Sequence, residues 1–131
     1  SPVCAPDLRK RLRRPADLAG VELLRSYRID EWPMWFKAAG VTAPNLRGWM
    51  FDSSLTLVEA AARGVGVALV PVAMFGQELG AGRIVQPFPI TIATGGYWLT
   101  RLKTRAETAA MSAFRHWLLA EIERPAQAVA R

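Results

Sequence analysis

The sequence has little of what disulfide-linked, metal-binding or membrane-spanning proteins need. Its one cysteine, Cys4, cannot form an internal disulfide, which favours a reducing cytoplasm over secretion. Its one histidine, His116, has no cysteine, aspartate or second histidine at the spacing of a metal site, so we expect no metal and no cofactor. The longest uncharged apolar stretch, residues 65–75, contains a proline and is far shorter than the ~20 residues of a membrane-spanning helix.

Motifs of catalysis are also missing. Cys4 has no histidine near it in the sequence, and the serines of "FDSS", residues 51–54, lack the flanking glycines of a hydrolase nucleophile elbow. Asp30 and Glu31 are more simply explained as the cap and the first turn of a helix that contains Trp32. We therefore expect a protein that is not an enzyme.

Positive charge exceeds negative charge, with 17 Lys and Arg residues against 11 Asp and Glu residues. Five of the basic residues lie in "LRKRLRR", residues 8–14, where Leu8 and Leu12 are spaced to share one face of a short helix. This pattern indicates a solvated helix face more than a phosphate-binding patch. No helix-turn-helix, zinc-finger spacing or RNA-binding aromatic motif accompanies the basic run.

Strand and helix patterns alternate over the first two thirds of the chain, which indicates an α/β fold with a parallel sheet. The apolar run of residues 65–70 is typical of a strand buried on both faces. Aromatic side chains at residues 32, 35 and 36 form the expected buried stripe of one helix. We expect strands at residues 3–6, 21–26, 49–51, 65–70 and 83–86, and helices at residues 7–14, 31–39, 54–63 and 72–79.

The composition changes at "PFPITIATGG", residues 87–96, which is typical of an extended crossing strand that ends in a flexible joint. Beyond it we expect one strand, residues 97–103, and one amphipathic helix, residues 107–123. This helix has an apolar stripe that consists of Met111, Phe114, Leu118 and Ile122. One strand and one helix cannot enclose a core, so we expect this stripe to pack back onto the first part or to form a dimer contact.

The turn Asp52-Ser53-Ser54 lies between an expected strand and an expected helix. Parallel α/β sheets bind ligands at this position, beyond the carboxyl ends of their strands. Each of the three residues is a good helix N-cap, and a side chain that does not cap can face a cleft. Unpaired N–H groups and the positive end of the helix dipole would favour a carboxylate or phosphate there. A plain N-cap remains the alternative.

Four segments together resemble the effector-binding domain of LysR-type transcriptional regulators: "LLRSYRIDEWPMWFKAAG", "FDSSLTLVEAAARGVGVALVP", "LGAGRIVQPF" and "TGGYWLTRLKTRAETAAMSAFRHWLLAEI". The similarity covers roughly residues 2–123 and is greatest to regulators of β-lactamase expression. It implies a periplasmic-binding-protein-like (type 2) fold, with two α/β subdomains and a ligand between them. Residues 1–93 would be the complete subdomain II, and residues 94–131 the hinge and the returning C-terminal strand and helix of subdomain I.

The same resemblance implies site residues and partners. Ser54 matches a serine of the effector pocket, with Asp52 and Ser53 beside it, and Tyr97 matches a tyrosine at the base of the cleft. The effector would be a muropeptide or a nucleotide-linked cell-wall precursor. DNA would be bound only through a winged helix-turn-helix that these residues do not include. The full-length protein would be a cytoplasmic homo-oligomer, a dimer or tetramer, without a membrane partner.

Two other functions remain open at this stage. One is a LysR-type regulator of another pathway, of the glycine-cleavage type, that senses a small amino-acid-like ligand; "TGGYWLTRLK" argues against it. The other is a solute-binding protein of the same fold, which would be made with a secretion leader.

Overall fold

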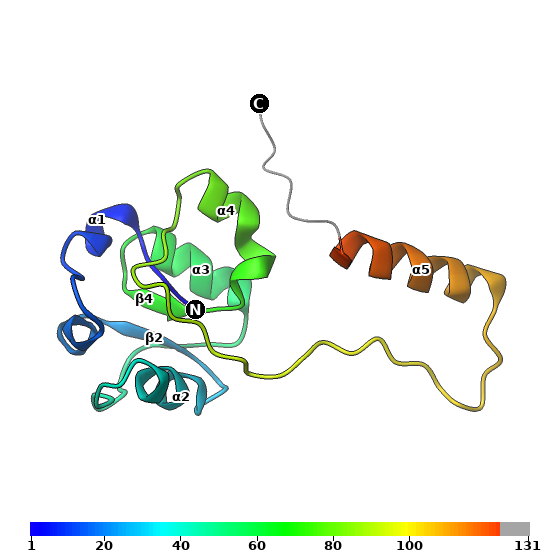
Figure 1. Cartoon of the computed structure of the whole chain (residues 1–131), viewed down its shortest axis with the longest axis horizontal. Coiled ribbons are helices and arrows are strands. Elements are labelled where there is room, and N and C mark those ends of the chain that lie inside the picture. The colour runs from blue at the N-terminus through cyan, green and yellow to red at the C-terminus, as the bar shows by residue number, and fades with distance from the viewer. Residues whose placement is uncertain (124–131) are drawn as a thin grey trace. The chain divides into compact units, whose positions relative to one another are not determined.

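A computed structural model describes residues 1–123 of the chain (Figure 1). The chain divides into two compact units, the first consisting of Ser1–Thr94 and the second beginning at Gly95. The first unit holds one four-stranded sheet, made of β1 (Pro2–Val3), β2 (Leu23–Ser26), β3 (Met50–Phe51) and β4 (Val67–Leu69). The strand order is β1-β4-β2-β3. β2 is parallel to both of its neighbours, β3 and β4, whereas β1 is antiparallel to β4, which confirms the predicted α/β class.

Short helices connect and cover the strands. The helical elements are α1 (Pro6–Arg9), η1 (Pro15–Gly20), α2 (Glu31–Ala38), α3 (Ser54–Ala62), η2 (Val72–Phe75), α4 (Gly76–Gly80) and α5 (Ala109–Glu123). In Figure 1, α2 lies on one side of β2 and β4, and α3 and α4 lie on the other. Among residues 1–123, no helix is both long enough and apolar enough to cross a bilayer.

The sheet separates two apolar clusters because successive side chains of a strand point to opposite faces. On β4, Val67 and Leu69 pack with the cluster on the α2 side, and Ala68 packs with the cluster on the α3 side. On β2, Leu23 and Leu24 divide in the same way. Both faces are therefore covered, as the apolar run of residues 65–70 predicted.

The cluster on the α2 side is rich in aromatic rings. Trp32, Trp35 and Phe36 are all buried, and their ring centroids lie 5.5–6.1 Å apart. The two indole groups also donate hydrogen bonds, from Trp32 Nε1 to the Leu24 carbonyl at 2.9 Å and from Trp35 Nε1 to the Ile90 carbonyl at 3.0 Å. These bonds satisfy the only polar atoms of the buried rings, so the packing leaves no buried donor unpaired.

Four predicted elements of the first unit were wrong in their extent. The strand predicted at residues 3–6 is β1, Pro2–Val3, and Pro6 already begins α1. Helix α1 ends at Arg9 rather than at residue 14, because the Asp17 carboxylate accepts the backbone N–H groups of Arg13 (2.8 Å) and Arg14 (2.9 Å). These backbone bonds lower the pKa of Asp17. The predicted helix 72–79 is divided into η2 and α4, and the predicted strand 83–86 is reduced to one bridge between Cys4 and Val85.

The crossing segment after residue 86 packs on the cluster of the α2 side, where Phe88 is buried and Ile90 and Ile92 are partly buried. The Ile90 carbonyl accepts hydrogen bonds from Ser1 Oγ and from Trp35 Nε1, each at 3.0 Å. Gln86 Nε2 in turn donates to Ser1 Oγ at 3.0 Å. The segment has no ladder of backbone hydrogen bonds, and Gly95 follows it with φ +122°, a conformation that glycine adopts without strain.

Over residues 95–123, the second unit contains α5 but no strand. Residues 97–103 do not form the predicted strand, since the described part of this unit offers no second strand to pair with them. Helix α5 begins at Ala109 rather than at residue 107, and Thr108 Oγ1 accepts the Met111 N–H at its start. In the predicted apolar stripe, Met111 and Leu118 are half-buried, and Phe114 and Ile122 are 52% and 70% exposed.

A close backbone approach at Gly66 holds β2 and β4 in register. The Val67 N–H donates to the Glu22 carbonyl at 2.9 Å, and a Cβ placed on Gly66 would press against that same carbonyl. Gly48, on the other side of β2, is similarly close to the Leu23 carbonyl. Only glycine fits at both positions without a shift of the backbone.

We expect Gly66→Ala to lower the free energy of unfolding by about 1–3 kcal/mol, because the added methyl group must displace backbone atoms. Urea unfolding of the variant and the parent protein measures this difference. Gly80→Ala is the matched control, since a Cβ there meets no atom within 4 Å. Equal unfolding midpoints for the two variants would contradict the proposed close approach.

Candidate functional site

Two adjoining depressions lie where the three parallel strands end. One is lined by residues 26–28 and 31 after β2, by residues 51–54 after β3, and by Leu57, Leu69 and Pro71. The other shares Ser26, Arg28 and Glu31 with it. The first is a shallow, open depression with a volume of about 30 Å³. Carboxyl ends of parallel strands are the usual ligand-binding edge of an α/β sheet, and both depressions lie there.

The turn after β3 places one of its two serines as a helix cap. Ser53 is the N-cap of α3, and its Oγ accepts the Leu55 N–H at 3.2 Å. Ser54 is the first residue of the helix, and both Ser54 and Asp52 are exposed at the depression. Capping by one member of the trio therefore leaves the Ser54 hydroxyl and the Asp52 carboxylate available to a ligand.

The first turn of α3 also has a backbone donor to offer. Within residues 1–123, the Ser54 N–H has no acceptor. The first N–H groups of a helix lack partners within the helix, and the helix dipole places partial positive charge there. This edge of the depression therefore favours an acceptor or an anion.

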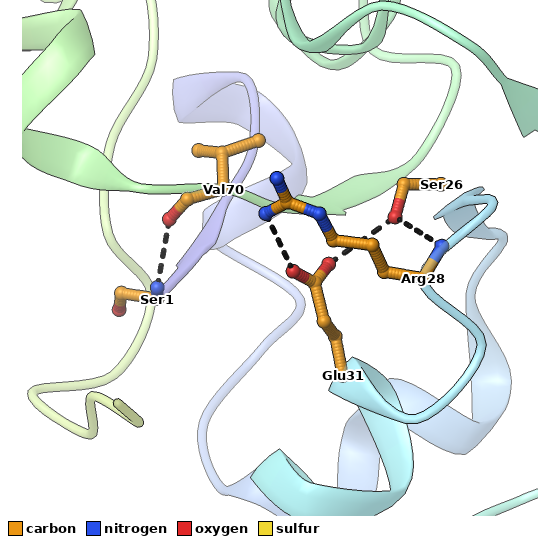
Figure 2. Close-up of polar contacts among 5 residues, drawn as sticks. All are labelled: Ser1, Ser26, Arg28, Glu31 and Val70. Atoms are coloured by element: carbon orange, nitrogen blue, oxygen red, sulfur yellow. Dashed lines mark hydrogen bonds and ion pairs between the residues drawn. The ribbon is translucent and has the colours of Figure 1, made fainter. Parts of the chain in front are cut away.

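A second polar cluster follows β2, as Figure 2 shows. Ser26 Oγ accepts the Arg28 backbone N–H at 3.1 Å and donates to Glu31 Oε2 at 3.2 Å. Arg28 Nη1 lies 3.3 Å from Glu31 Oε1 in an ion pair. In the same view the Ser1 amino group donates to the Val70 carbonyl at 2.9 Å, and burial lowers the pKa of that amino group, with Glu31 acting against the shift.

Sequence reasoning gave this cluster no role at the site. Asp30 was expected to cap α2, but its side chain makes no capping hydrogen bond. Glu31 was expected only in the first turn of α2, whereas its carboxylate also holds Ser26 and Arg28. The cluster follows the predicted strand 21–26 at its carboxyl end, so the rule that identified residues 52–54 would have identified it too.

Three of the four predicted site residues share one depression. Asp52, Ser53 and Ser54 line it together. Tyr97 belongs to the second unit, where its side chain is 74% exposed.

Neither Cys4 nor His116 lies in an environment that favours catalysis or metal binding. Burial raises the pKa of the Cys4 thiol to about 11, with Arg9 acting against the shift, so the thiol stays protonated near neutrality. His116 is exposed on α5. Over residues 1–123, no group of three or more His, Cys, Asp or Glu side chains is close enough to hold a metal ion.

Comparison with protein families and curated proteins gives consistent matches. The family of the LysR substrate binding domain matches residues 1–123. The HTH-type transcriptional activator AmpR of Pseudomonas aeruginosa is 55% identical over 119 residues, which are 89% of this chain and 40% of that protein. The activator of the same name from Enterobacter cloacae is 50% identical over 126 residues, 95% of this chain and 43% of that protein. The chain thus spans about two fifths of the length of the curated relatives it matches.

Solved structures agree with this similarity. The effector domain of the transcriptional regulator AmpR of Pseudomonas aeruginosa matches with a TM-score of 0.88 at 52% identity, covering 93% of this chain and 60% of that chain. The AmpR effector binding domain from Citrobacter freundii matches with the same TM-score at 47% identity, covering 93% and 62%. These matches confirm the predicted type 2 periplasmic-binding-protein-like fold. Another structure of the Citrobacter freundii domain carries three substitutions, threonine to valine, serine to alanine and tyrosine to phenylalanine.

The two serines of the turn predict different effects on stability. Ser53→Ala removes the acceptor of the Leu55 N–H and should lower the free energy of unfolding by about 0.5–2 kcal/mol. Ser54→Ala removes no capping bond and should stay within about 0.5 kcal/mol of the parent protein. Chemical unfolding of both variants side by side measures the difference, and a larger loss for Ser54→Ala would show that the cap is assigned to the wrong serine.

Proposed function

Because the chain belongs to the family of LysR substrate binding domains, we propose that it is the effector-sensing part of a transcriptional regulator that controls β-lactamase expression in response to cell-wall muropeptides. The relatives that share 50–55% of its residues are transcriptional activators named AmpR. The effectors would be anhydro-muropeptides as inducers and a nucleotide-linked precursor as repressor. The similarity to AmpR favours this pathway over a glycine-cleavage regulator and over a solute-binding protein.

The position of the Ser54 hydroxyl is the observation that best supports the proposed binding site. The Ser54 hydroxyl lies at a depression on the carboxyl edge of the sheet, and Ser53, not Ser54, caps α3. A hydroxyl that is not used in capping can donate to and accept from a ligand at the same time. The Tyr97 hydroxyl is proposed as a second contact.

The regulatory step follows from a difference in affinity. An effector shifts a protein between two arrangements only to the extent that it binds one of them more tightly. Effector contacts that differ between the two arrangements of the full-length regulator would supply that difference in affinity. DNA binding and homo-oligomer formation, as a dimer or tetramer, are proposed for the full-length regulator, which would act in the cytoplasm. We assign the chain no enzymatic activity and no cofactor.

We expect Ser54→Ala in the intact regulator to weaken binding of an anhydro-muropeptide roughly two- to tenfold, the range for loss of one neutral hydrogen bond. Isothermal titration measures the affinity, and a β-lactamase promoter reporter measures the response. Thr56→Val is the control, since its hydroxyl donates to the Ser53 carbonyl at 2.9 Å and does not line the depression. Unchanged affinity and induction in Ser54→Ala would remove Ser54 from the site.

Tyr97→Phe keeps the ring and removes one hydroxyl. If that hydroxyl contacts the effector, titration with the same anhydro-muropeptide should show an affinity loss of roughly two- to tenfold, with no change in the melting temperature of the free protein. Superimposable titration curves for the two proteins would limit Tyr97 to a packing role.

A further inference from the structure

The polar cluster after β2 adds a charged group to the site. Arg28 and Glu31 line both depressions, together with Ser26, and the turn that contains Ser54 also lines the first of them. The proposed role of Ser54 does not involve the Arg28–Glu31 ion pair. The presence of a charged pair at the depression therefore needs a separate explanation.

The two charged side chains of this cluster differ in exposure. The Glu31 side chain is 15% exposed, and its two carboxylate oxygens are held by Ser26 Oγ and by Arg28 Nη1. The Arg28 side chain is 48% exposed. A ligand in the depression can therefore reach the guanidinium of Arg28. Ser26 holds the Arg28 backbone N–H, and Glu31 holds the Arg28 guanidinium.

The chemistry of residues 52–54, which line the same depression, agrees with that of Arg28. The first turn of α3 presents the Ser54 N–H and the positive end of a helix dipole to the same depression. A guanidinium binds carboxylates and phosphates through paired hydrogen bonds. Asp52 also lines the depression and is exposed, so an anion would be directed toward Arg28 and away from the Asp52 carboxylate.

We propose that Arg28 receives an acidic group of the effector, a carboxylate or a phosphate, and that Glu31 and Ser26 are positioning residues for its guanidinium. This assignment rests on the proposed function, since it concerns the same effector. It makes Arg28 a specificity-determining residue that distinguishes acidic effectors from their neutral analogues. The ion pair with Glu31 would hold the guanidinium in place before the effector arrives.

The test combines one protein change with one ligand change. Arg28→Gln and the parent regulator, both full length, are titrated with an anhydro-muropeptide that has free carboxyl groups and with the same compound after its carboxyl groups are converted to amides. Arg63→Gln is the matched control. It removes the same charge and a similar exposed ion pair, Arg63 with Glu59, at the other end of α3. Uridine diphosphate is a third probe, because it carries phosphates without a peptide.

Arg28→Gln should weaken binding of the free acid about tenfold to one-hundredfold, the range for a charged hydrogen bond, and leave binding of the amide unchanged. Arg28→Lys keeps the charge but not the planar fork and should recover only part of the loss. A loss confined to uridine diphosphate would also support the assignment and would identify the phosphate as the acidic group.

Other outcomes overturn the assignment. Equal losses for acid and amide, or equal losses in Arg28→Gln and Arg63→Gln, would show a general effect of charge or folding. Unchanged affinities in Arg28→Gln, with the Ser54→Ala loss intact, would remove Arg28 while the proposed function stands. If the parent regulator binds none of the probes, both the assignment and the muropeptide function fail.

Discussion

Parallel pairing of β2 with a strand on each side is the constraint on which the rest of the first unit depends. The register joins Leu23 to Val67 and Leu24 to Ala68 on one side, and Ser26 to Phe51 on the other. This pairing brings the carboxyl ends of β2, β3 and β4 to one edge, and with them the polar residues that follow each strand. Gly48 and Gly66 allow it, because their backbones lie against β2 where no side chain fits.

The polar residues at this edge form the proposed binding site. The turn after β3 uses Ser53 as the helix cap and leaves the Ser54 hydroxyl without a capping role, and the loop after β2 adds the cluster of Ser26, Arg28 and Glu31. The crossing segment is bound at the Ile90 carbonyl by Trp35 and Ser1.

Much of the fold could be predicted because its causes are local. Alternating apolar patterns located the strands and helices of the first unit, and the aromatic stripe of Trp32, Trp35 and Phe36 is buried as expected. Predictions failed where a particular hydrogen-bond partner decides and the apolar pattern does not show it. The Asp17 carboxylate, a few residues along the chain, ends α1 early, and residues 97–103 have no strand to pair with in the described chain. At the site, the Asp52-Ser53-Ser54 turn was recognised from its position, but choosing the capping serine and the role of Glu31 required the side-chain contacts.

Hydrogen exchange of the intact regulator, with and without an anhydro-muropeptide, tests the central claim most directly. If the carboxyl edge of the sheet binds the effector, backbone amides of residues 26–31 and 52–57 should exchange more slowly when the compound is bound, since their N–H groups would be bonded or shielded. Slower exchange confined to other parts of the protein, with these two segments unchanged, would contradict the claim.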